Sequence, residues 1–174
     1  MYPEEYIHFL AHFHGDRDYF ECHEILEEYW KKSNDQSKDS IWVGLILLAV
    51  SAYHHRRANF NGAGRTLNKA IHIFTSQQNT LPKIGLEKQT LFSLLTNQLA
   101  IIKKEEAYQS YHLPITDPFL LKDCIKKCEQ IGYSWNTASN LSDKSLVDRH
   151  ILRDRSSVIQ ERIDAIIIKK GNDS

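Results

Sequence analysis

The chain has 174 residues, and its 22 lysines and arginines balance its 22 aspartates and glutamates. This composition excludes a collagen-like, disordered or disulfide-stapled protein, and the net charge of zero disfavours nucleic acid as a partner. Seven glycines and four prolines leave long stretches that can be helical. The sequence therefore predicts an all-α fold, a helical bundle of about five core helices with a C-terminal two-helix extension.

The spacing of apolar residues predicts the five core helices in chain order. The second has one broad apolar face, and the third is apolar nearly all round, as expected of a central buried helix. The NFNGAG segment at 59–64 is predicted to be a turn. The helices are expected at about residues 3–13, 16–33, 41–58, 65–78 and 91–108.

The character of the sequence changes after Tyr111. Asp117 and Pro118 begin a predicted short helix over 119–131, and a long final helix is predicted over 145–169. Basic and acidic residues are mixed along this last helix, which favours an ion-paired, solvated face over a nucleic-acid contact. We therefore divide the chain into a helical core domain, residues 1–112, and a C-terminal helical extension, residues 113–174, packed on the core.

Cysteine usage and hydropathy indicate a cytoplasmic location. The chain has an odd number of cysteines, three, and the segment MYPEEYIHFL does not have the pattern of a signal peptide. The longest apolar run, 41–53, is shorter than the roughly 20 residues that a transmembrane helix needs. We expect a cytoplasmic protein that does not enter the membrane.

Two segments closely resemble a bacterial family catalogued as domain of unknown function 309: RDYFECHEILEEYWK at 17–31 and WVGLILLAVSAYHHRRANFNGA at 42–63. The first carries the family's Phe-x-x-His-Glu-x-x-Glu-x-x-Trp pattern, and Ala58 stands where the family usually has a turn glycine. The resemblance implies an all-helical bundle and supplies no activity. The positions that match the family's motifs are Phe20, His23, Glu24, Glu27, Trp30, Gly44, Ala49, His54, Asn59, Gly62 and Ala63.

His23 and Glu27 stand at i and i+4, so they share one face of the second predicted helix. The segment His23-Glu24-x-x-Glu27 is similar to the zinc-protease pattern His-Glu-x-x-His, with Glu27 in the place of the second histidine. One imidazole and one carboxylate need a further metal ligand from another helix, which His54 or His55 is expected to provide. The alternative is that His23 and Glu27 hydrogen-bond each other and fix the register of a buried polar seam.

The net charge of zero hides a local imbalance. Residues 1–34 carry eight acidic and three basic side chains, whereas residues 35–113 carry five acidic and nine basic ones. The acidic first helix pair is therefore expected to face a basic third and fourth helix, with the candidate site at their junction.

These observations lead to two hypotheses about function. In the first, the protein binds a small molecule or a divalent metal in an interhelical polar site, with His23 or Glu27 as general base if the site is catalytic. In the second, it is a helical interaction module for a protein partner, and the polar seam only shapes its groove. The candidate metal ligands are His23, Glu27 and His54. The candidate ligand-binding residues are His23, Glu24, Glu27, Trp30, His54, Arg57 and Asn59.

Overall fold

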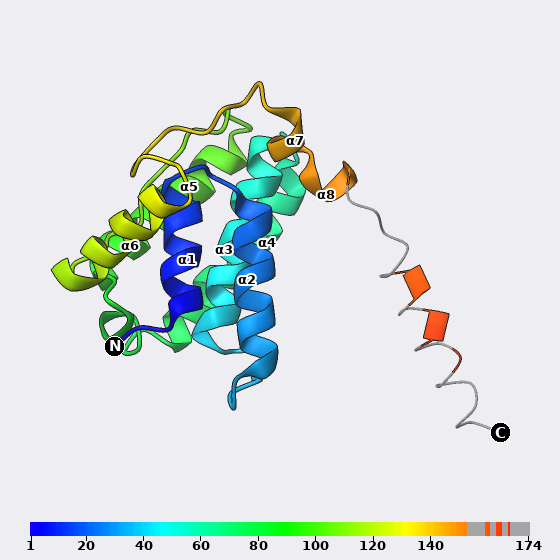
Figure 1. Ribbon diagram of the computed structural model, residues 1–174. Coiled ribbons are helices and arrows are strands. Elements are labelled where there is room, and N and C mark those ends of the chain that lie inside the picture. The colour runs from blue at the N-terminus through cyan, green and yellow to red at the C-terminus, as the bar shows by residue number, and fades with distance from the viewer. Residues whose placement is uncertain (153–158, 161–162, 165–166, 168–174) are drawn as a thin grey trace.

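The structure, a computed structural model, describes residues 1–152, 159–160, 163–164 and 167. It confirms the all-α class, since the only β-type pairing among these residues is one isolated bridge between Leu86 and Ile115. Figure 1 shows the helices in chain order. They are α1 (Glu4–His14), α2 (Tyr19–Lys32), α3 (Ile41–Arg56), α4 (Phe60–Ser76), the short 3-10 helix η1 (Pro82–Ile84), α5 (Lys88–Lys103), α6 (Pro118–Gln130), α7 (Lys144–Val147) and α8 (Arg149–Leu152).

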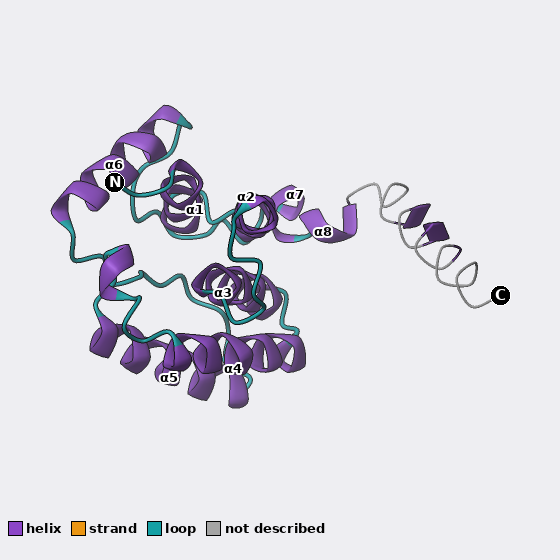
Figure 2. Ribbon diagram, turned by 90° about the horizontal axis from the view of Figure 1, so that it is seen from below, coloured by secondary structure: helices purple, strands orange, loops and turns teal. Residues whose placement is uncertain are grey.

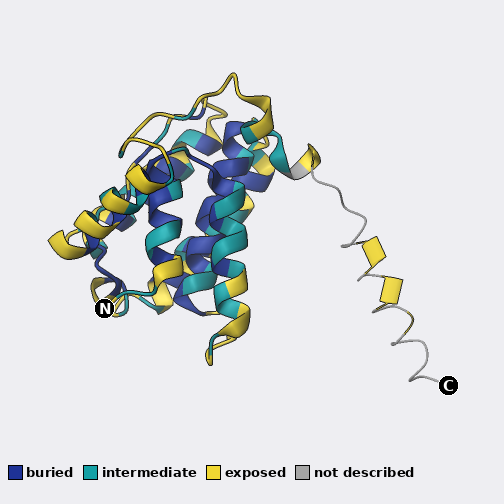
Figure 3. Ribbon diagram, in the orientation of Figure 1, coloured by how far each residue is buried: buried dark blue, intermediate teal, exposed yellow. Residues whose placement is uncertain are grey.

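Helix α3 lies at the centre of the bundle, as its apolar sequence predicted. Figure 2 shows α3 between a layer formed by α1 and α2 and a layer formed by α4 and α5, and most of α3 is buried (Figure 3). Gly44 lets α4 approach closely, because a Cβ atom at this position would lie 2.7 Å from a ring carbon of Phe74. About two turns further on, the Ser51 hydroxyl donates to the Ala63 carbonyl at 2.8 Å.

Helix α2 begins at Tyr19 rather than at the predicted Asp16. Arg17 has a left-handed backbone conformation, with φ of 60°, which interrupts helical geometry just before Asp18. The Asp18 carboxylate then caps α2 by accepting a hydrogen bond from the Glu21 amide. The fully buried Arg17 side chain ties the end of α1 to distant loops. It donates to the carbonyl oxygens of Phe13, Tyr111 and Thr137.

The predicted turn over 59–64 is wrong, because residues 60–64 begin α4 and Asn59 caps it. The chain turns at Ala58, whose φ is 56°, and Asn59 caps the helix by accepting a hydrogen bond from the Gly62 amide at 3.0 Å. Glycine at position 62 leaves room for this cap, since a Cβ atom there would lie 2.7 Å from Asn59 Nδ2. The asparagine that suggested a loop is the cap of a helix, and the glycines lie within that helix.

Two further helix ends differ from the sequence predictions. Helix α5 ends at Lys103 instead of continuing to Tyr108, because Glu105 turns into the left-handed region, with φ of 56°. The predicted long final helix is interrupted at Asp148, which separates α7 from α8 and pairs with Arg57 at 3.0 Å. The later part of that predicted helix lies partly outside the described residues.

Beyond the central helices, α6 packs against α1. The division into a core domain, residues 1–112, and an extension, residues 113–174, stays a prediction. Among the residues that the structure describes, no helix combines the length and apolar character needed to cross a membrane.

Candidate functional site

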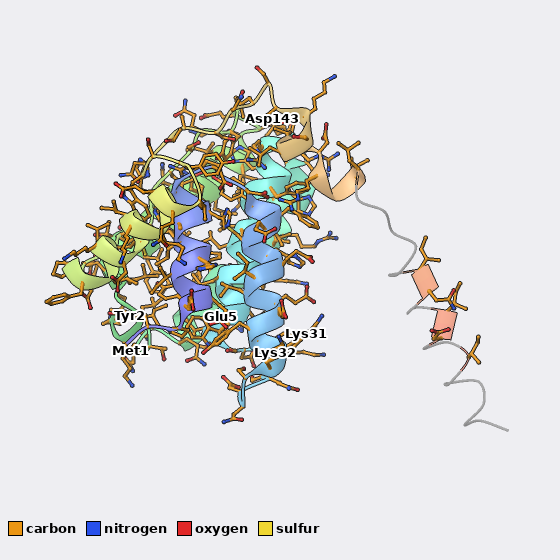
Figure 4. All side chains as sticks on the ribbon, viewed as in Figure 1. Met1, Tyr2, Glu5, Lys31, Lys32 and Asp143 are labelled. Atoms are coloured by element: carbon orange, nitrogen blue, oxygen red, sulfur yellow. The ribbon has the colours of Figure 1, made fainter. Side chains whose placement is uncertain are left out.

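Helix α2 carries a cluster of one imidazole and two carboxylates. Nδ1 of His23 lies 3.1 Å from Oε1 of Glu24, and Nε2 of the same ring lies 3.2 Å from Oε2 of Glu27. The three side chains are half-buried, with 29–34% of their surface exposed. Lys31 closes one side of the cluster, with its Nζ 2.8 Å from Oε1 of Glu27. Figure 4 shows Lys31 and Lys32 at the end of α2 remote from Asp143, the residue that caps α7.

The donor atoms of this cluster are of a kind that could hold a cation. A carboxylate can only accept hydrogen bonds, and a neutral imidazole has a single N–H. His23 therefore satisfies both neighbours only when it is protonated on both nitrogens, or when another cation takes the place of one proton. One ligand atom from each of the three residues lies within 4.8 Å of the others. Bonds of about 2.0–2.2 Å to one ion need separations below about 4.4 Å, so small side-chain rotations close the set.

A pocket between α2 and α3 adjoins this cluster. Its volume is about 180 Å³, and His23 contributes to its wall from α2 while His54 contributes from α3. The rest of the lining is apolar or aromatic, so the pocket combines two imidazoles with a largely hydrophobic interior. The other lining residues are Tyr19, Phe20, Val50 and Tyr53.

The hydrogen bonds of Asn59 determine the orientation of His54. Because Oδ1 of Asn59 accepts the Gly62 amide, its Nδ2 is directed to Nδ1 of His54, 3.1 Å away, and donates to it. Neutral His54 consequently carries its proton on Nε2 and acts there as a hydrogen-bond donor. The cap of α4 thus sets the tautomer of a histidine that lines the pocket.

Two of the predicted site residues lie elsewhere. The Arg57 guanidinium donates from Nε to Asp148 at 3.0 Å and lies 5.5 Å from the centre of the Tyr53 ring. The Trp30 indole donates to the Ser37 carbonyl at 3.1 Å, which attaches the loop after α2 to that helix. Both residues support the surroundings of the site rather than joining the cluster of His23, Glu24 and Glu27.

The cluster that could hold a metal ion differs from the predicted ligand set by a single residue. His23 and Glu27 are together as predicted, but the third member of the cluster is Glu24, from the same helix, and His54 is outside it. His54 instead shares the pocket with His23. The role of His54 as a metal ligand stays a prediction.

Sequence reasoning missed the aromatic walls and the basic residue near them. The family pattern did point to Phe20, but no motif singled out Tyr19 or Tyr53. Arg149 of α8 pairs with Asp18 and Glu21 at the start of α2, with 3.2 Å between Nη2 and the Glu21 carboxylate. A pairing across more than 120 residues leaves no signal in local spacing.

Cys22 precedes the cluster in the chain but does not join its chemistry. Its side chain is fully buried, and burial together with the nearby carboxylates of Asp16, Asp18 and Glu21 raises the pKa of the thiol well above its ordinary value. The thiol stays protonated at neutral pH and donates to the Phe9 carbonyl. A cysteine acts as a nucleophile in its thiolate form, so the protonated Cys22 does not supply a nucleophile to the site.

Comparisons with known proteins cover the site. Residues 6–66 match the model of a family described as domain of unknown function 309. Over 162 residues, the chain is 44% identical to a protein of Bacillus subtilis (strain 168) named uncharacterized protein YpuF, and the match covers 93% of each chain. No solved structure matches the chain. The cluster on α2 and the pocket both lie inside the segment that matches the family model.

Proposed function

The chain belongs to the family of domain of unknown function 309, and we propose that it binds a divalent metal ion through His23, Glu24 and Glu27, beside the pocket between α2 and α3. The observation that carries this proposal is the placement of both His23 ring nitrogens within 3.2 Å of carboxylate oxygens. One imidazole and two carboxylates suit first-row transition ions such as Mn²⁺, Fe²⁺, Co²⁺ and Zn²⁺. Coordination positions left open by the protein would be available to a ligand in the pocket.

Isothermal titration calorimetry with MnCl₂ and ZnCl₂ tests this proposal. We expect one ion per chain and release of protons on binding, since metal ligands bind in their deprotonated form. Titrations in two buffers with different heats of ionisation measure that release directly. His23→Gln and Glu27→Gln should each abolish binding.

Two matched controls come from neighbouring residues. Glu28→Gln removes an exposed carboxylate that pairs with Lys32 on the same helix, and His8→Gln breaks a histidine–glutamate pair with Glu4 on α1, 3.4 Å apart. Both variants should bind metal as the wild type does. Equal affinity in the wild type and His23→Gln, or no binding of either ion at millimolar concentration, would overturn the proposal.

The second hypothesis, an interaction module with a purely structural polar seam, predicts a different result from the same variants. If the cluster serves only packing, His23→Gln and Glu27→Gln lower the unfolding temperature and metal ions have no effect on it. In the metal-binding case, saturating metal raises the unfolding temperature of the wild type alone. A protein partner stays a prediction.

We also propose a cytoplasmic location. All three cysteines, Cys22, Cys124 and Cys128, are buried free thiols, which supports a reducing compartment. Fractionation of cells producing the protein tests this, and recovery outside the cytoplasmic fraction would contradict it.

A further inference from the structure

The pocket between α2 and α3 has a size and lining that define a class of ligand. Its volume of about 180 Å³ is close to that of a cavity of about 150 Å³ that binds benzene. Tyr19, Phe20 and Tyr53 contribute aromatic rings to the lining, and Val50 contributes an aliphatic side chain. Such a lining favours a flat, apolar group of about six carbon atoms.

The polar groups of the pocket specify the rest of the ligand. His54 is a donor from Nε2, because Asn59 donates to its Nδ1 at 3.1 Å. The two ring nitrogens of His23 lie 3.1 and 3.2 Å from carboxylate oxygens of Glu24 and Glu27. Because His23 also lines the pocket, a cation bound by this cluster lies next to the pocket. A donor histidine and a neighbouring cation both favour an acceptor oxygen on the ligand.

The charges next to the aromatic rings agree with this choice. The Arg57 guanidinium lies 5.5 Å from the centre of the Tyr53 ring, and the Arg56 guanidinium lies 4.8 Å from the centre of the Tyr19 ring. Arg56 is 8% exposed, and its Nε is buried without a hydrogen-bond partner. Two guanidinium groups thus lie over rings that line the pocket, and their positive charge disfavours a cationic ligand there.

We propose that this pocket binds a small monocyclic aromatic compound that carries one acceptor oxygen, of the benzoate or phenol type. The ring lies among the aromatic side chains, and the oxygen accepts from His54. Where the proposed metal function holds, the same oxygen also approaches the ion held by His23. The inference thus rests in part on that function, but the ring and the His54 contact do not require a metal.

Ligand-observed NMR and calorimetry with four probes test the class. Benzoate and phenol carry the ring and the oxygen, toluene lacks the oxygen, and benzylamine carries a cationic donor in its place. We expect benzoate or phenol to bind at least about tenfold more tightly than toluene and benzylamine, the ratio that one hydrogen bond of about 1.4 kcal/mol gives. The difference between benzoate and phenol tells whether the oxygen is recognised as an anion. Tighter binding of benzylamine would overturn the assignment.

Two variants separate the pocket from the metal cluster. Val50→Phe fills the pocket and should weaken benzoate or phenol binding at least about tenfold, whereas the metal affinity stays as in the wild type. The matched control is Val43→Phe, which changes another half-buried valine of α3 outside the pocket lining. This variant should bind the metal ion and benzoate or phenol as the wild type does. His54→Phe keeps the ring but loses the donor, so in metal-free protein it should erase the preference for oxygen over toluene.

The outcomes of the two proposals are distinguishable. If neither Mn²⁺ nor Zn²⁺ binds but benzoate or phenol binds with the expected effect of Val50→Phe, the pocket assignment stands and the metal function is wrong. If metal binds and none of the four probes does, or if Val50→Phe and Val43→Phe bind them equally, the ligand class is wrong. Thermal unfolding of each variant confirms that a lost signal comes from a folded protein.

Discussion

The buried His14 makes the fold sensitive to acid, and the structure gives the size of the effect. Its Nδ1 donates to the Leu10 carbonyl at 2.9 Å, and its Nε2 accepts from the Leu113 amide at 2.9 Å. The ring is 1% exposed and stacks on Trp135 with 4.4 Å between centroids. Both ring nitrogens are thus hydrogen-bonded in the neutral form of the ring, with the proton on Nδ1.

Burial of the ring, reinforced by the charge of Arg17, lowers the pKa of His14 from 6.5 to about 3. Because the folded pKa is below the unfolded one, the unfolded chain binds more protons between these two values. The stabilisation is therefore present above pH 6.5 and is lost as the pH falls towards 3. One pKa unit corresponds to about 1.4 kcal/mol of stability. The free energy of unfolding therefore falls by about 5 kcal/mol over the full range between the two pKa values, and by about 2 kcal/mol from pH 7 to pH 5.

Urea unfolding followed by circular dichroism at pH 7 and pH 5 measures this contribution. His14→Gln removes the titrating group. Between pH 7 and pH 5, the free energy of unfolding of the variant should therefore fall by about 2 kcal/mol less than that of the wild type. The pH difference is the readout, because the lost hydrogen bonds and stacking lower the stability of the variant at both. His72→Gln, on an exposed histidine of α4, is the control and should follow the wild type.

The contribution of His12 does not affect this comparison. Burial opposes protonation of that ring, but the hydrogen bond and charge of Asp16, with the charges of Asp18 and Glu21, raise its pKa overall. His12 is present in every variant, so its effect cancels in the difference. Equal losses of stability in the wild type and His14→Gln, or a His14 ring that titrates near pH 6.5 by NMR, would refute the reasoning.

Two further predictions concern packing and the C-terminal helices. Gly44→Ala should lower the free energy of unfolding by about 1–3 kcal/mol, because the added Cβ atom meets Phe74; thermal unfolding measures this, and an unchanged midpoint would contradict it. Arg149→Ala should increase hydrogen exchange in α7 and α8, since the ion pairs with Asp18 and Glu21 are lost. Salt at about 1 M should also increase exchange in these helices of the wild type, because it screens the ion pairs. Lys144→Ala, the control, should leave the exchange unchanged.

The elements that the sequence predicted well are those determined by local interactions. Apolar periodicity and a capping Asp117 placed α6 within a residue of its actual bounds, and the i, i+4 spacing of His23 and Glu27 placed both in one cluster. The errors arose where a single backbone dihedral angle determines where a helix begins or ends. Arg17 and Glu105 both have positive φ, which is uncommon for residues other than glycine and has no signature in hydrophobic spacing.

The acidic α1 and α2 are expected to face the basic α3 and α4, and the ion pairs show which partners the charges of α2 and α3 take instead. Asp18 and Glu21 pair with Arg149 of α8, Glu28 pairs with Lys32 of its own helix, and Arg57 of α3 pairs with Asp148. Among the described residues, the long-range ion pairs of α2 and α3 thus run to Asp148 and to Arg149 of α8. The space between α2 and α3 is consequently lined by rings and by two histidines that are held by short-range partners. A pocket with few fixed charges suits recognition of a ring with one polar atom, which a seam of ion pairs would have excluded.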